Sequence, residues 1–175
     1  MGTGGLDAHD VKRTLGRMAH EILEKSGGAD ELVVVGVLQM GYPVAQRLAF
    51  AMANIEGVGV PCGSLDIEGF RDDRRSSDEG DKSEIPFAVN GKRVILVDEV
   101  IQTGRTIRAA MDSLMRHGRP AKIELAVLID RGGRELPIEP NYVGRKMEVS
   151  PDEVIEVRLD AEGEEVVRVV KGSSI

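Results

Sequence analysis

Residues 94–106 read VILVDEVIQTGRT, and this stretch decides the fold. Its first four residues are large and aliphatic with no polar alternation, which is typical of a strand buried on both faces in a helix-covered parallel sheet. Beyond residue 106, apolar residues recur at three- and four-residue steps, as on one face of an amphipathic helix. The stretch therefore predicts a strand, a polar loop and a helix in succession.

The polar loop is expected at the carboxyl end of a parallel strand and the amino end of a helix, where open α/β sheets bind ligands. Unpaired N–H groups and the helix dipole favour an anion there, most often a phosphate. Gly104 permits a positive φ or a close approach, and Thr103 and Thr106 supply hydroxyl donors. We therefore predict a phosphate site in this loop.

Two carboxylates, Asp98 and Glu99, precede the loop and would repel a phosphate unless something else is bound between them. Ribose hydroxyls can donate to a carboxylate, and Mg2+ binds carboxylate oxygens. The residues thus indicate a pocket for a sugar phosphate with a metal. The alternative is a solvated acidic pair that only caps the helix. The combination with an aliphatic strand and Thr-Gly-x-Thr argues against that alternative.

The composition is that of an ordinary globular chain: 175 residues, 41% hydrophobic and 30% charged, enough for one domain over residues 1–175. We recognise neither a membrane span nor a signal peptide, and we expect a cytoplasmic protein without membrane contact. The single cysteine, Cys62, excludes an intrachain disulfide. A formal net charge of −7 means that RNA binding would need a local basic patch.

Periodicity elsewhere predicts alternating helices and strands. Residues 58–70 fit either a strand pair or one bent strand, and the tail fits a hairpin over about 153–170. Residues 71–84 hold no apolar side chain, so we expect an exposed, flexible lid over about 71–85. The remaining predicted elements are helices at 8–25, 43–55 and 107–115 and strands at 31–38, 123–130 and 142–143.

The stretch VILVDEVIQTGRT resembles the phosphoribosyl-diphosphate (PRPP) binding motif of the type I phosphoribosyltransferases. The resemblance implies their α/β fold, a central parallel sheet flanked by helices, with a small hood made by the loop after Gly132 and the terminal hairpin. It implies that Asp98 and Glu99 hold the ribose, that residues 103–106 hold the 5-phosphate, and that Mg2+ is held mainly by PRPP. The implied PRPP-binding residues are Asp98, Glu99, Gln102, Thr103, Gly104, Arg105 and Thr106.

A narrower resemblance is to the pyrimidine operon attenuator proteins called PyrR, which bind pyr messenger RNA and are also uracil phosphoribosyltransferases. It covers nearly the whole chain. It implies PRPP, uracil, UMP, UTP and a pyr mRNA leader as partners, and a homodimer or larger homo-oligomer, for which the apolar first helix is a candidate contact surface. The stretches that carry it are GRMAHEI, FRDD, TGRTIRAAMD, GRPAKIELAVLIDRGGRELPI and YVGR, in this order.

The PyrR resemblance also implies roles for residues outside the PRPP motif. The loop Gln39-Met40-Gly41, itself a second strand-to-helix glycine loop, would carry the pyrophosphate. Arg71, Asp72 and Asp73 would form the start of the flexible lid. Arg71 would also act in catalysis with Asp98 and Glu99. The implied base-binding residues are Asp130, Arg131, Tyr142 and Val143, and the implied RNA-binding residues are Lys12, Arg13, Arg17 and His20. An exposed, solvated helix face is the alternative for the last group.

Several positions depart from the family pattern. The family usually has arginine where this chain has Met40. Unlike arginine, methionine cannot donate a hydrogen bond to pyrophosphate. It usually has aspartate and tyrosine at the positions of Glu99 and Gln102, and histidine and arginine at those of Gly133 and Glu139. The last two changes remove a cation and add a carboxylate, which weakens contact with RNA phosphates.

These considerations predict a uracil phosphoribosyltransferase, a regulator of pyrimidine gene expression that binds pyr mRNA, or both. Two alternatives stay open. One is a nucleotide-sensing, RNA-binding attenuator with weak or no catalysis, which the loss of a cation at Met40 favours. The other is a phosphoribosyltransferase for another base, such as a purine.

Overall fold

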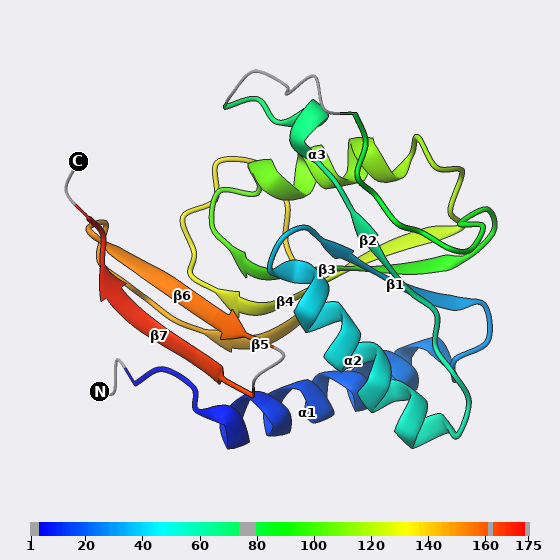
Figure 1. Ribbon diagram of the computed structural model, residues 1–175, viewed down its shortest axis with the longest axis horizontal. Helices are drawn as coiled ribbons and strands as arrows, with labels where there is room; N and C mark the ends of the chain where they lie inside the picture. The colour runs from blue at the N-terminus through cyan, green and yellow to red at the C-terminus, as the bar shows by residue number, and fades with distance from the viewer. Residues whose placement is uncertain (1–3, 74–79, 161–162, 174–175) are drawn as a thin grey trace.

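The computed structural model describes residues 4–73, 80–160 and 163–173, and its centre is a parallel sheet (Figure 1). The strands run in the order β2-β1-β3-β4-β5, and each neighbouring pair is parallel. The predicted parallel sheet is therefore confirmed. The strands are β1 (Leu32–Val37), β2 (Cys62–Leu65), β3 (Arg93–Ile101), β4 (Lys122–Asp130) and β5 (Tyr142–Lys146).

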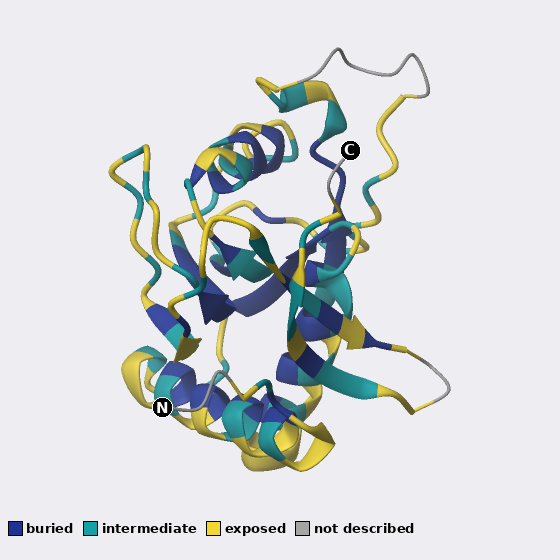
Figure 2. Cartoon of the chain, turned by 90° about the vertical axis from the view of Figure 1, so that its left-hand side faces the viewer, coloured by how far each residue is buried: buried dark blue, intermediate teal, exposed yellow. Residues whose placement is uncertain are grey.

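Helices cover both faces of this sheet. Figure 1 shows α1 (Ala8–Ser26) and α2 (Gly41–Glu56) on one face and α3 (Arg105–Leu114) on the other. Successive residues of β1 alternate between the two cores, since Val34 packs with the α1 and α2 side chains while Val33 and Val35 pack with those of α3. Coverage on both faces explains why these strands read as unbroken aliphatic runs, and Figure 2 shows them largely buried.

The tail forms the predicted hairpin from β6 (Glu153–Leu159) and β7 (Glu165–Lys171). Leu6, just before α1, pairs with Val167 of β7, so the start of the chain extends this small sheet. Ile155 and Val157 of β6 are buried in the same core as α1 and α2. The hairpin is therefore fastened to the main body through its apolar face.

Two predicted elements need correction. Of the two alternatives for residues 58–70, the strand pair is wrong. The region holds one strand, β2, which is shorter than expected and is followed by a short 3-10 helix, η1 (Glu68–Phe70). The first helix is no free contact surface, because its apolar face, including Leu15 and Met18, is buried in the core. Residues 74–79, the middle of the predicted lid, lie outside the described residues. Among the described helices, none is long and apolar enough to cross a membrane.

Candidate functional site

The acidic pair lies inside β3 and not in the loop after it. Asp98 pairs with Val127 of β4, and the pairing continues to Ile101 opposite Asp130. The aliphatic run ends earlier, at Val97, because only the middle of the strand is covered by both cores. The ordered backbone of a central strand thus holds Asp98 and Glu99, and the Asp98 residue is only 4% exposed.

Burial dominates the electrostatics of this pair. It raises the pKa of Asp98 well above the ordinary value, and the hydrogen bond and negative charge of Glu99 raise it further. The Glu99 N–H, which donates to Asp98 Oδ1 at 2.9 Å, and the positive charge of Arg71 act in the opposite direction. Two crowded carboxylates of this kind would gain from hydroxyl donors or from a cation.

The phosphate loop, residues 102–106, follows directly and leads into α3. Gly104 is buried with φ +90°, which favours glycine, and α3 begins at Arg105. The Arg105 N–H donates to Thr103 Oγ1 at 3.1 Å. Among the described residues, the N–H groups of Thr103 and Gly104 find no acceptor. Free N–H groups beside a helix N-terminus are suited to an anion.

The side chains of Arg105 and Arg71 are held by carboxylates. Arg105 donates to Asp72 Oδ2 at 2.9 Å and to Glu135 Oε1 at 3.1 Å. Arg71 donates to both carboxylate oxygens of Asp73, at 2.9 and 2.7 Å, and these contacts raise the pKa values of both guanidinium groups. The beginning of the predicted lid is thereby attached to the phosphate loop.

The predicted pyrophosphate loop lies against the acidic pair. A Cβ atom added at Gly41 would be 2.7 Å from the carbonyl oxygen of Val97 and 3.1 Å from the Cα atom of Asp98. Met40 is half-buried, packs against the core of α1 and α2, and makes no capping hydrogen bond at the start of α2. The loop therefore offers N–H groups and the helix dipole to an anion, without a cation of its own.

A hollow of about 260 Å³ opens next to the phosphate loop. Val100 and Gln102 line it from one side, and Arg131, Val154 and Ile155 from the other. Arg131 donates to the carbonyl oxygen of Glu153 at 3.2 Å and so ties the hairpin to this place. Sequence reasoning missed Val154 and Ile155, because alternation in the tail identifies a hairpin but not the surface on which it docks.

The predicted base-binding set is only partly brought together. Arg131 lines the hollow, but Tyr142 does not. Tyr142 is buried, pairs with Ala126 halfway along β4, and donates its hydroxyl to Glu124 at 3.0 Å. Burial and Glu124 raise the pKa of Tyr142. Its neighbour Val143 pairs with Val127, also halfway along β4, and packs with the core of α3. Of these predicted residues, Arg131 lines the hollow and Tyr142 and Val143 do not, because β5 reaches the carboxyl edge of the sheet only at Lys146.

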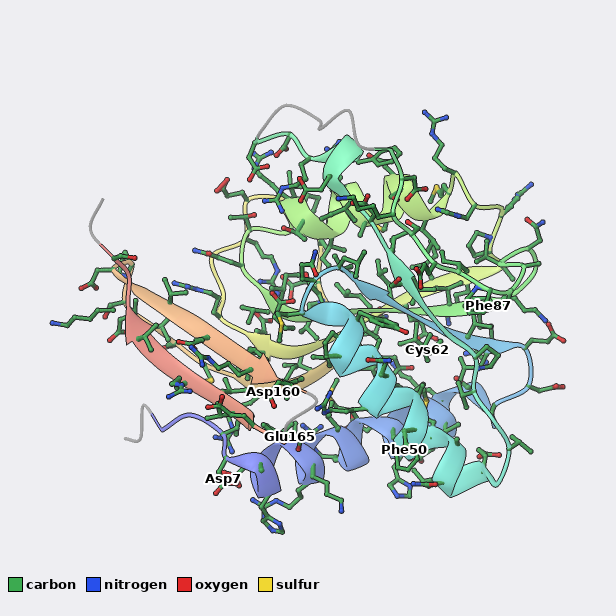
Figure 3. The ribbon with its side chains drawn as sticks, viewed as in Figure 1. Asp7, Phe50, Cys62, Phe87, Asp160 and Glu165 are labelled. Carbon is green, nitrogen blue, oxygen red and sulfur yellow. The ribbon has the colours of Figure 1, made fainter. Side chains whose placement is uncertain are left out.

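The four predicted RNA-binding residues differ in their surroundings. Arg13 pairs with Asp10, and Arg17 pairs with Glu21 and donates to the carbonyl oxygens of Val143 and Gly144. Lys12 and His20 form no ion pair with any described residue. Both line a groove between α1 and α2 that also contains Phe50, labelled on α2 in Figure 3.

Comparison with known proteins identifies the family. Residues 6–162 match the model of the phosphoribosyl transferase domain. A bifunctional protein PyrR from Geobacter sp. (strain M21) is 52% identical, over 90% of this chain and 90% of its own. Another, from Chloroflexus aurantiacus, is 46% identical over 97% of this chain and 95% of its own. The chain belongs to the PyrR family.

Solved structures agree with the type I phosphoribosyltransferase fold. The hypoxanthine phosphoribosyltransferase of Trypanosoma cruzi superposes with a TM-score of 0.70 at 17% identity, over 95% of each chain. A hypoxanthine-guanine phosphoribosyltransferase from Bacillus anthracis gives a TM-score of 0.66 at 23% identity, over 95% of this chain and 97% of its own. The predicted fold class is confirmed, and PyrR relatives place the chain more narrowly within it.

Proposed function

We propose that this protein transfers the phosphoribosyl group of PRPP to uracil, forming UMP and releasing pyrophosphate. The observation that carries the proposal is the arrangement of three parts of the site in a PyrR-family chain. The buried residue Asp98 lies against the glycine loop at Gly41, and the phosphate loop at residues 102–106 follows directly after the strand that holds Asp98. This arrangement matches the ribose, pyrophosphate and 5-phosphate of one PRPP molecule.

In this proposal Asp98 and Glu99 accept hydrogen bonds from the ribose hydroxyls, and the phosphate loop binds the 5-phosphate through N–H groups and threonine hydroxyls. Positioning and charge neutralisation are the main demands of the reaction, because the ribosyl centre becomes positive as pyrophosphate leaves. Arg71, which acts electrostatically on Asp98, is the proposed cation at the edge of the site.

Mg2+ is the proposed cofactor, and it would supply neutralisation of the pyrophosphate charge. The acidic pair, in which Asp98 is buried and Glu99 half-buried, fits a nearby divalent cation. No group of three His, Cys, Asp or Glu side chains in the described parts of the chain could hold a metal ion alone. Mg2+ would therefore depend on PRPP oxygens for most of its coordination.

We place the base in the hollow beside the phosphate loop. Val100 and Val154 offer aliphatic surfaces to the faces of a flat ring, and Gln102 and Arg131 offer polar groups to its edge. Asp130 is unsuited to a base contact, since both its carboxylate oxygens accept hydrogen bonds from Arg134.

The proposal is tested by incubating the protein with PRPP, Mg2+ and each nucleobase in turn and measuring the nucleotide formed. Among the nucleobases, only uracil is expected to yield a nucleotide, UMP. A purine nucleotide would support the alternative base. PRPP binding without any nucleotide would support the non-catalytic attenuator.

The change M40R should restore a cation to the pyrophosphate loop. We expect it to lower the KM for PRPP by about threefold to tenfold, because a charge-assisted hydrogen bond to pyrophosphate is added at the start of α2. M40L is the matched control, since it keeps the apolar packing and adds no charge. Equal KM values for M40R and M40L would show that the loop does not contact pyrophosphate.

We also propose pyr mRNA binding, for which Lys12 and His20 are the candidate contacts because they are free of ion pairs within the described structure. K12Q should weaken retention of a pyr leader hairpin in a filter assay and reduce the salt slope by about one. K122Q, at the amino end of β4, is the control. If wild-type protein retains no RNA with or without UMP, this second function is refuted.

Homo-oligomer formation, a cytoplasmic location and a single domain over residues 1–175 stay predictions. We propose α2 instead of α1 as the contact surface, because Phe50 and Ile55 on α2 are 69% and 40% exposed. Light scattering of wild-type protein and F50D would test it: a monomeric wild type, or an F50D variant as associated as wild type, argues against this surface.

A further inference from the structure

Arg134, in the segment between β4 and β5, has no role in the site as described so far. Its side chain is only 15% exposed, and its guanidinium group contacts three different parts of the chain. It donates to both carboxylate oxygens of Asp130, at 3.0 and 2.7 Å. It also donates to the carbonyl oxygens of Gln102, at 3.0 Å, and of Ile138, at 2.7 Å. The bond to Gln102 joins it to the phosphate loop.

The residues after Arg134 hold the next carbonyl group of the same loop. The N–H groups of Glu135 and Leu136 donate to the carbonyl oxygen of Thr103, at 2.9 and 3.1 Å. Side chains reinforce this contact, because Leu136 and Ile138 pack 3.4 to 3.7 Å from the position that a Cβ atom of Gly104 would occupy. Two successive carbonyl groups of the phosphate loop are thus turned toward one neighbouring segment.

Peptide geometry links the direction of these carbonyl groups to the direction of the N–H groups that follow them. In a planar trans peptide, the N–H of one residue points opposite to the C=O of the residue before it. Holding the Gln102 carbonyl therefore orients the Thr103 N–H, and holding the Thr103 carbonyl orients the Gly104 N–H. Neither of these N–H groups has an acceptor among the described residues.

We infer that Arg134 is a positioning residue that aims the Thr103 and Gly104 N–H groups at the substrate 5-phosphate without touching the substrate itself. The inference rests on the proposed function, which puts the phosphate in this loop. If Arg134 released the Gln102 carbonyl, that peptide could rotate and present an oxygen lone pair to the phosphate. Binding would then lose a donor and gain a repulsion.

Only arginine suits this position. Its planar fork can serve a carboxylate bidentately and still donate to two carbonyl groups, whereas lysine has three donors on one atom. Asp130 compensates the buried charge: burial by itself would raise its pKa, but the hydrogen bonds from Arg134 and from the Gly132 N–H outweigh burial and lower it. Asp130 thus stays ionised at neutral pH and serves Arg134, not the base.

The test compares ligands that differ only in the phosphate. Binding of UMP and of uridine is measured by calorimetry for wild type, R134Q and R134K. We expect both variants to bind UMP roughly 10- to 100-fold more weakly, the range for hydrogen bonds to a charged group, with uridine changed less than about twofold. R93Q is the matched control, because Arg93 is also half-buried and bonds the Ser26 carbonyl and Glu124, but at the opposite end of β3.

A second measurement reads the N–H groups directly. Inorganic phosphate should shift the amide resonances of Thr103 and Gly104 in wild type and in R93Q, but not in R134Q. The inference is overturned if R134Q binds UMP as wild type does, if uridine and UMP weaken equally, or if phosphate leaves these resonances unmoved in wild type. A wild type that shows the phosphate effects but forms no UMP from uracil would refute the proposed function alone.

Discussion

The variant D98N is expected to lower kcat/KM for UMP formation by roughly 100- to 1,000-fold, the loss seen when one preorganised polar contact is removed from an active site. An amide keeps the size of the side chain but presents N–H donors where ribose hydroxyls need acceptors. The rate of UMP formation with PRPP and uracil measures this effect. A D98N enzyme within about threefold of wild type would show that the carboxylate is not used.

The same variant should be more stable than wild type at neutral pH. Because burial and Glu99 raise the pKa of Asp98, the folded protein binds this proton more tightly than the unfolded chain does. Ionisation of Asp98 therefore costs stability as the pH rises above the ordinary value toward the folded pKa. The advantage of D98N should grow over this interval and then level off.

Denaturant unfolding at several pH values between about 4 and 8 measures this dependence. D112N provides the control, because Asp112 is half-exposed on α3 and its pairing with Arg108 is a surface ion pair. We expect D112N to differ from wild type by less than about 0.5 kcal/mol at every pH. A stability difference between D98N and wild type that is independent of pH would contradict the assigned burial effect.

The variant G41A is expected to disrupt activity and stability together. Its Cβ would lie 2.7 Å from the Val97 carbonyl oxygen and 3.1 Å from Asp98 Oδ1, so either the loop or β3 must move. Overpacking of this kind costs about 1 to 3 kcal/mol. Since a displacement of about 1 Å from the reacting geometry can cost roughly 100-fold in rate, UMP formation should fall by that order.

G16A is the matched control for G41A. A Cβ at Gly16 would meet nothing within 4 Å, and the residue lies inside α1. Alanine there should raise the free energy of unfolding by up to about 1 kcal/mol through helix propensity, with kcat/KM unchanged. If G41A retained wild-type activity, the close approach between the glycine loop and the acidic pair would not matter for catalysis.

The local sequence pattern was sufficient to predict most of the helices and strands. The aliphatic runs, the apolar face of α1 and the alternation in β6 and β7 each report on the immediate surroundings of their own residues, and all three predictions are confirmed. The errors concern distant partners. Whether Asp98 belonged to a strand depended on β4, with which it pairs, and nothing near Asp98 in the chain reports that pairing.

The residues of the site likewise divide into those that neighbouring sequence identifies and those whose surroundings depend on distant segments. Asp98, Glu99 and residues 102–106 could be proposed as a site from the sequence, because an anion site of this kind is built from consecutive residues at one strand-to-helix junction. The surroundings of Tyr142 could not be predicted, because the register of β5 places it opposite Ala126 with its hydroxyl bonded to Glu124. Val154 and Arg134 were missed because their roles depend on where a hairpin docks and where one guanidinium reaches.

The sequence by itself therefore determined the fold class and the ribose-phosphate motif, since both follow from periodicity and from neighbouring residues. Only the tertiary structure decided which surfaces meet at the hollow beside the phosphate loop, which carboxylates are paired with arginines, and which N–H groups have no acceptor among the described residues. The physical reason is that hydrogen bonding and burial at the site are set by residues tens of positions apart, whose meeting depends on strand register and on packing between layers.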